Sequence, residues 1–106
     1  MKLYHATKLD NKDNILRCGL QPTTDRYSNF NRYIKTEGVY GFTEIKDALG
    51  FAKDQCWNNG IAIFSFETSN SNLILDPEYD DPDYGIAYFY KIEKSVDAIL
   101  EYEIKF

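Results

Sequence analysis

The sequence is poor in the residues that build metal centres and covalent frameworks, and this shortage excludes several kinds of protein. It contains one histidine, two cysteines, one tryptophan, one methionine and three prolines. Cys18 and Cys56 form no CxxC pair and are too few for a disulfide framework, so we expect two buried thiols in a cytoplasmic protein. One histidine and two distant cysteines offer no zinc site, and we expect no bound metal.

Long apolar runs are also missing, and positive charge is scarce. No stretch is apolar over the length that a signal peptide or a membrane span requires, so we expect no membrane association. The net charge is −5, divided as +3 over residues 1–53 and −8 over residues 54–106. Because nucleic acids are bound by a net basic face, this balance argues against general nucleic-acid binding. A basic rim in the first half is still compatible with a small anionic ligand.

Aromatic residues, by contrast, are abundant. Nine Tyr and seven Phe contribute to an aromatic share of 16% in 106 residues. Such side chains bury a large area with little loss of rotamer freedom, which suits the core of a small sheet. The length allows one hydrophobic core, so we predict a single domain spanning residues 1–106.

Apolar periodicity predicts two helices among short strands, and therefore the α+β class. We expect the first helix to be capped by Asp10 and to end at Gly19, with Leu20 packed behind it. Its predicted inward residues are Ile15, Leu16 and Cys18. We expect the second helix to be capped by Thr43. Its predicted inward face consists of Ile45, Ala48, Leu49, Ala52 and Cys56.

The predicted strands cover residues 2–5, 39–43, 61–67, 72–75, 86–90 and 100–106. In the first strand, Leu3 and His5 share one side and Tyr4 takes the other. In residues 61–67, one face consists of Ile61, Ile63 and Ser65, and the other of Ala62, Phe64 and Phe66. The last strand alternates strictly, which predicts the following inward residues: Leu100, Tyr102, Ile104 and Phe106.

Two polar segments have no periodicity, and each leaves two interpretations open. Residues 21–37 form either a surface excursion or a lid whose aromatic side chains Tyr27, Phe30 and Tyr33 close over a ligand. The second segment is acidic and contains Asp76, Glu78, Asp80, Asp81 and Asp83. It is either a solvated loop or a docking surface for a basic protein partner, with Tyr79 and Tyr84 as aromatic anchors.

Three short motifs follow one another in a recognisable order: LYHAT, then ILRCGLQP, then VYGFT before the second helix. This order resembles the ADP-ribosyltransferase superfamily, in the branch with a His–Tyr–Glu signature. Its small bacterial and phage members typically read YHGT, GL and VYLT. The resemblance extends over most of the chain and is closest in the first half. It implies a split β-sheet core with two short helices, and NAD as the cofactor.

The resemblance implies catalytic roles for His5, which would bond the ribose beside the nicotinamide, and for Tyr40, which would stack on the nicotinamide ring. The residues implied in binding this nicotinamide nucleotide are His5, Ala6, Thr7, Arg17, Tyr40 and Phe42. Ala6 stands where glycine is usual and adds a methyl group close to the carboxamide. Independently of the family, a neutral imidazole both donates to and accepts from a ribose diol, and an aromatic face suits a pyridinium cation.

Both residues also have an ordinary structural interpretation. A single histidine beside a strand is often a satisfied core residue, and Tyr40 belongs to a chain rich in tyrosine. The binding interpretation requires the two rings to face each other across a cleft wide enough for a flat heterocycle.

The glutamate of the signature has no clear counterpart. The best-aligned run places Ala87 at its position, which removes the negative charge that would stabilise a developing oxocarbenium ion. Glu101 and Glu103 are near in sequence but alternate outward on the last strand. The other carboxylates that could take the role are Glu67 and Asp83.

Two functions stay open, and a third is weaker. The first is mono-ADP-ribosyl transfer to a macromolecular acceptor, with Arg17, Arg26 or Arg32 meeting the diphosphate. The second is a catalytically degenerate binding protein, such as a phage inhibitor or host-defence modulator, that sequesters a nucleotide or blocks a protein through its acidic face. The third, transfer of an RNA 2'-phosphate to NAD, requires more arginines around the phosphate.

Overall fold

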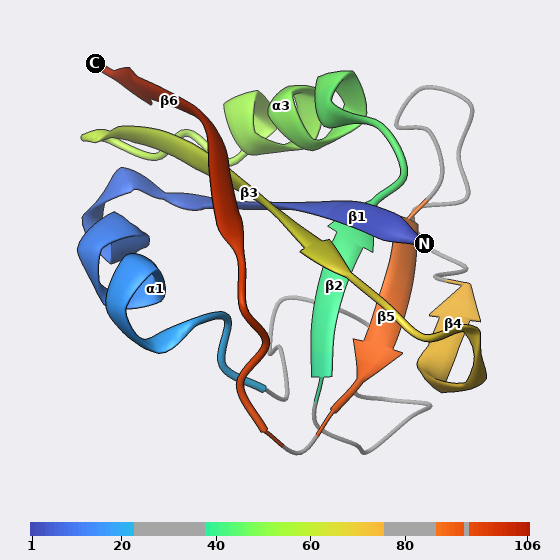
Figure 1. Cartoon of the computed structure of the whole chain (residues 1–106). Helices are drawn as coiled ribbons and strands as arrows, with labels where there is room; N and C mark the ends of the chain where they lie inside the picture. Colours follow the sequence, from blue (N-terminus) through green and yellow to red (C-terminus); the bar gives the residue numbers. More distant parts are fainter. Residues whose placement is uncertain (23–37, 76–86, 93) are drawn as a thin grey trace.

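The computed structural model describes residues 1–22, 38–75, 87–92 and 94–106 (Figure 1). These residues form a six-stranded antiparallel sheet with the strand order β4-β5-β2-β1-β3-β6. The strands are β1 (Lys2–Lys8), β2 (Gly38–Phe42), β3 (Gly60–Glu67), β4 (Leu73–Leu75), β5 (Ala87–Lys91) and β6 (Ile99–Lys105). The helices are α1 (Lys12–Cys18) and α3 (Ile45–Asp54), with single 3-10 turns η1 (Leu9–Asn11) and η2 (Asn70–Asn72). The predicted α+β class is confirmed.

The sheet is nearly divided between β1 and β2. Strand β1 pairs with β3 over its whole length, from Lys2 opposite Glu67 to Lys8 opposite Ile61. Strand β1 pairs with β2 at a single position, where Tyr4 lies opposite Phe42. Figure 1 shows the reason, because β2 approaches β1 across its direction rather than alongside it. The ladder between β1 and β2 therefore ends at this pair, and we call this interruption of the pairing the gap in the sheet.

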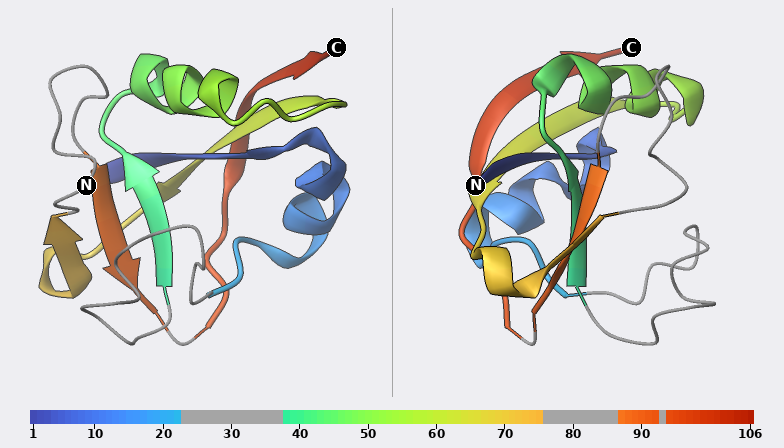
Figure 2. Two further views of the ribbon diagram at one scale, coloured as in Figure 1. Left: turned by 180° about the vertical axis from the view of Figure 1, so that it is seen from behind. Right: turned by 90° about the vertical axis from the view of Figure 1, so that its right-hand side faces the viewer.

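The two helices cover opposite faces of the β1–β3 pair (Figure 2). On one face, α3 packs on alternate residues of β3 in a group that we call the α3-side cluster, whose buried members are Ala6, Phe42, Ala48, Phe51, Ala52, Ile61 and Ile63. On the other face is the α1-side cluster, with Leu3, Ile15, Leu20, Val39, Ala62, Phe64 and Phe66. The predicted alternation of residues 61–67 is confirmed, as is the burial of Leu20 behind Gly19.

The helix starts differ from the predictions. Asp10 lies in η1, and its carboxylate accepts a hydrogen bond from the Asn59 side chain at 3.0 Å instead of capping α1. Thr43 precedes the N-cap of α3, which is Glu44 and makes no side-chain cap bond. The buried residues of α3 are Ala48, Phe51 and Ala52. Ile45, predicted to face inward, lies in the first turn of α3 and is 37% exposed.

The prediction that both cysteine thiols are buried is wrong, since Cys18 and Cys56 are exposed. Cys18 is the last residue of the short helix α1, where Ile15 alone is buried and Leu16 is also exposed. Cys56 lies beyond the end of α3 with a φ of 57°, so the helical spacing that predicted an inward position does not reach it.

The strict alternation predicted for the last strand is also wrong. The register with β3 shifts, because Tyr102 lies opposite Ile63 and Leu100 lies opposite Phe64, which leaves Glu101 as the extra residue of a β-bulge. Leu100 therefore packs on the α1-side cluster and Ile104 on the α3-side cluster. Tyr102 stays 38% exposed, and Phe106, just past the strand, stays 68% exposed.

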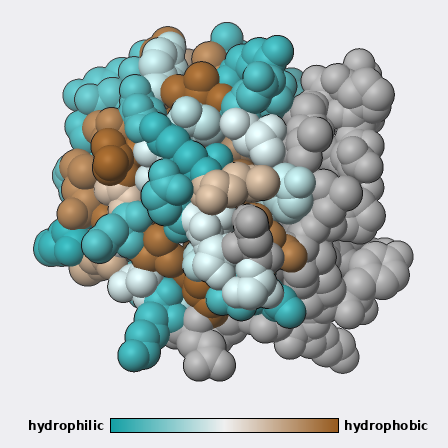
Figure 3. Space-filling model, turned by 45° about the vertical axis from the view of Figure 1, so that its right-hand side comes forward, coloured by the Kyte–Doolittle hydropathy of each residue, from teal (hydrophilic) through white to brown (hydrophobic). Residues whose placement is uncertain are grey.

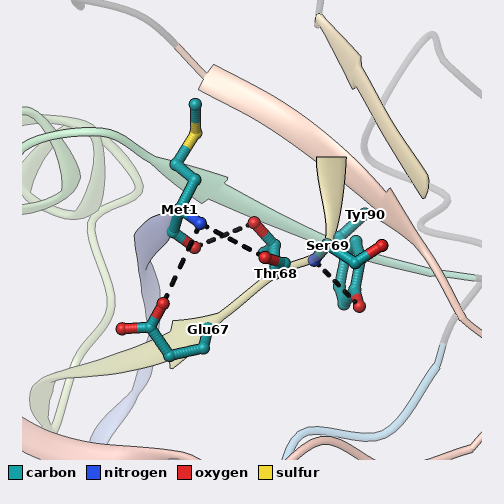
Figure 4. Close-up of polar contacts among 5 residues, drawn as sticks. All are labelled: Met1, Glu67, Thr68, Ser69 and Tyr90. Atoms are coloured by element: carbon teal, nitrogen blue, oxygen red, sulfur yellow. Dashed lines mark hydrogen bonds and ion pairs between the residues drawn. The ribbon is translucent and has the colours of Figure 1, made fainter. Parts of the chain in front are cut away.

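The start of β1 is tied to the segment that follows β3 (Figure 4). The amino group of Met1 donates to the carbonyl oxygen of Thr68 at 3.2 Å and lies 3.9 Å from the Glu67 carboxylate. The Thr68 hydroxyl donates to the carbonyl of Met1 at 2.8 Å. The next amide, that of Ser69, donates to the hydroxyl of Tyr90 on β5 at 3.3 Å, which connects the two halves of the sheet. Of the helices in the described part of the chain, none has the length and apolar character needed to cross a membrane.

Candidate functional site

The candidate site lies where β1 and β2 separate. Strands β1 and β2 pair with each other only through Tyr4 and Phe42. His5 directly follows Tyr4 on β1, and Tyr40 lies two positions before Phe42 on β2. In a regular ladder, the main-chain groups of these strands would bond one another here. Side chains take over this role in the gap.

Each of the two rings bonds the main chain of the opposite strand. His5 Nδ1 lies 2.9 Å from the carbonyl oxygen of Tyr40, and the Tyr40 hydroxyl donates to the carbonyl oxygen of Ala6 at 3.0 Å. These two bonds form a reciprocal pair across the gap, which we call the His5–Tyr40 clasp. They give the carbonyl groups of Tyr40 and Ala6 hydrogen-bond partners across the point where the two strands diverge.

The clasp determines which nitrogen of His5 bears the proton. A carbonyl oxygen only accepts hydrogen bonds, so Nδ1 must be the donor to Tyr40. In the neutral imidazole, Nε2 is then the acceptor. The His5 side chain is partly buried.

The two rings are in direct contact. Their centroids are 4.6 Å apart with an interplanar angle of 55°. A flat ligand between them would need about 3.5 Å on each side, or about 7 Å in all. The rings face each other as expected, but the expectation of a cleft between them is wrong, because the hydrogen bonds of the clasp draw the two side chains together.

The Tyr40 ring packs against two aromatic residues of the α3-side cluster, Phe42 and Phe51. Its centroid lies 5.6 Å from that of Phe51 and 6.5 Å from that of Phe42, both in edge-to-face arrangements. Phe42 is fully buried, so it supports Tyr40 from within the core and offers no surface to a ligand. Phe51 was not on the predicted inward face of α3, and its place follows from the spacing of Ala48 and Ala52.

Ala6 is part of the clasp through its carbonyl group, Thr7 follows it on β1, and Arg17 lies apart from the clasp. Ala6 is 1% exposed, and its carbonyl already accepts from Tyr40. The Thr7 hydroxyl accepts from the Asn11 side chain at 2.9 Å, a contact that fixes its orientation. Asn11 was missed by the sequence reasoning, because this bond depends on the 3-10 turn that follows β1. Arg17 is exposed, lies on α1 over the opposite cluster, and bonds Asn14 at 3.4 Å.

No carboxylate substitutes for the missing glutamate among the residues that the structure describes near the clasp. The register places Ala87 opposite Phe42 at the start of β5. Glu101 accepts a hydrogen bond from the buried Ser65 hydroxyl at 2.6 Å, and its carboxylate lies 3.2 Å from the Lys2 ammonium. Both contacts lower the pKa of the Glu101 carboxyl below its ordinary value, and the bond from Ser65 has the larger effect.

The other two described candidates are also engaged elsewhere. Glu103 pairs with Lys12 at 2.7 Å, and this bond raises the pKa of the Lys12 ammonium. Glu67 pairs with the amino terminus. Asp83, Arg26, Arg32, the three lid aromatics and the acidic segment with Asp76, Glu78, Asp80 and Asp81 lie outside the described residues, so those predictions stay as they are.

Comparison with known proteins identifies no relative: no family model, no curated protein and no solved structure matches the chain. Among residues 1–22, 38–75, 87–92 and 94–106, no three side chains of His, Cys, Asp or Glu are grouped as metal ligands. The functional argument therefore depends on the geometry of the clasp.

Proposed function

We propose that this chain is an ADP-ribosyltransferase-like domain that binds a nicotinamide nucleotide, with NAD as the ligand, and acts by binding rather than by rapid transfer. The single observation that supports this proposal is the His5–Tyr40 clasp. It unites the two residues that the motifs LYHAT and VYGFT single out, at a gap between neighbouring strands. The near division of the sheet at the same point is in keeping with a split β-sheet core.

The geometry of the clasp specifies how the ligand would be held. The ring centroids are 4.6 Å apart, which excludes the arrangement expected from the sequence, with a flat heterocycle between the rings. The proposal therefore keeps only a nicotinamide held beside the ring pair. The ribose lies against the His5 imidazole, whose proton stays on Nδ1. The pyridinium cation is attracted to the electron-rich face of Tyr40.

The same geometry argues against fast transfer. Cleavage of the nicotinamide–ribose bond builds positive charge on the ribose, and a carboxylate beside the sugar would stabilise it. Loss of one such electrostatic partner lowers turnover by roughly 10²–10³-fold or more. Ala87 supplies no charge, and Glu101 and Glu103 are paired elsewhere.

Calorimetric titration with NAD+ and an assay for nicotinamide release test the proposal together. We expect binding by the wild type that is lost in His5→Ala and weakened in Tyr40→Phe. Tyr90→Phe is the matched control, because it removes a hydroxyl whose partner, the Ser69 amide, is exposed. An Ala87→Glu variant should gain nicotinamide release.

Three outcomes would count against the proposal. A wild type that does not bind NAD+ contradicts it outright. Equal loss of binding in Tyr90→Phe would show that the effect of removing a tyrosine hydroxyl is not specific to the clasp. Rapid nicotinamide release by the wild type, with no gain in Ala87→Glu, would support the transferase instead.

A further inference from the structure

Strand β6 forms one edge of the described sheet, with β3 as its neighbour. On the face shown in Figure 3, apolar surface is broken into separate patches by hydrophilic side chains. At the end of β6, by contrast, two large aromatic side chains are exposed on the same strand: Tyr102 is 38% exposed and Phe106, just past the strand, is 68% exposed. An exposed edge of this kind is a template for pairing with another strand.

Along β6, the main-chain N–H and C=O groups of successive residues point alternately toward β3 and away from it. One hydrogen bond shows which residues point toward β3. The amide of Phe106 donates to the carbonyl oxygen of Asn59 at 3.2 Å, on the β3 side. Because main-chain groups alternate along an antiparallel strand, those of Tyr102 and Ile104 also turn toward β3. Those of Glu103 and Lys105 therefore turn toward the free edge.

We propose that this edge binds a second copy of the chain, by antiparallel β6–β6 pairing about a two-fold axis at Ile104. In this register Glu103 lies opposite the partner's Lys105, and both residues present their main-chain groups to each other. On the other side of the ribbon, Tyr102 lies opposite the partner's Phe106. Both the charged and the apolar pairs are thus complementary, and each occurs twice.

The neighbouring two-fold registers are disfavoured by charge. An axis at Tyr102 places Glu103 opposite the partner's Glu101 twice. An axis at Glu103 places that residue opposite itself, and the Glu101 that it sets opposite the partner's Lys105 is already bonded to Ser65 and Lys2. A lysine on an edge strand usually prevents pairing, but in the proposed register Lys105 meets a carboxylate. Residues 102–106 give a small interface, so the dimer is weak and depends on concentration. This inference is independent of nucleotide binding.

Sedimentation equilibrium over a wide range of concentrations tests the proposal on the full chain. Lys105→Glu and Glu103→Lys each create two like-charge contacts, so each should raise the dimer dissociation constant about tenfold. A mixture of the two variants restores opposite charges at both contacts and should recover the wild-type constant. Lys91→Glu is the control for Lys105→Glu, because it makes the same change in net charge at an exposed position on β5 and should leave the constant unchanged.

Recovery in the mixture also shows that both variants are folded, which matters because Glu103→Lys loses the ion pair with Lys12. A wild type that stays monomeric at every concentration overturns the proposal. So does a mixture that fails to recover, or an equal loss of dimer in Lys91→Glu.

Discussion

Replacing Tyr40 by Phe removes one hydroxyl and keeps the ring, so it isolates one hydrogen bond of the clasp. The hydroxyl donates at 3.0 Å to the carbonyl of Ala6, a residue that is 1% exposed. A typical hydrogen bond contributes a net 0.5–1.5 kcal/mol, and a buried acceptor left without its donor costs about 1–3 kcal/mol. We therefore expect Tyr40→Phe to lower the free energy of unfolding by about 2 kcal/mol.

Urea denaturation gives this value, and Trp57 is a suitable reporter because it is the one tryptophan and packs against the α3-side cluster. With a slope of about 1–3 kcal/mol per molar urea, the midpoint should fall by roughly 0.7–2 M with an unchanged slope. The control Tyr90→Phe should change the free energy by less than about 0.5 kcal/mol, because water replaces its exposed partner. A Tyr40→Phe variant as stable as Tyr90→Phe would refute the reasoning, since the Ala6 carbonyl would then not depend on Tyr40.

Two further predictions concern other parts of the sheet. Gly41→Ala places a Cβ atom 2.8 Å from that of Leu3, so urea unfolding should show a loss of about 1–3 kcal/mol; unchanged stability would mean that β1 and β2 shift apart freely. Ser65 and Lys2 lower the pKa of Glu101, so this carboxylate stabilises the fold above its ordinary pKa and loses that effect as the pH falls through the lowered value. Wild type should accordingly exceed Glu101→Gln in stability at neutral pH and match it in acid, and a difference that does not change with pH would contradict the assignment.

The parts of the fold that depend on local periodicity could be predicted from the sequence. The alternation of Ile61 to Phe66 indicated a strand buried on both faces, and Gly19 with a φ of 78° ends the first helix as expected. The two exposed cysteines were not predictable in this way, because each lies at the end of a helix whose length depends on tertiary packing. Local pattern alone does not determine where a short helix stops.

The candidate site was predictable in its members but not in its geometry. The motifs single out His5 and Tyr40. The hydrogen bonds of the clasp, however, join residues that are 35 positions apart (His5 and Tyr40) and 34 positions apart (Ala6 and Tyr40) in the sequence. The same applies to Glu101, whose bond to Ser65 spans 36 residues and depends on a β-bulge that no alternation reveals. Contacts of this kind arise from the register of paired strands, which a single sequence does not specify.

The most direct test of the nucleotide site is the NMR signal of the His5 imidazole during titration with NAD+. Since the chain contains one histidine, its ring protons are identified without ambiguity. The account predicts a shift that saturates with NAD+ and disappears in Tyr40→Ala, where the ring partner of His5 is missing. Ring signals that stay unchanged at saturating NAD+ would contradict it.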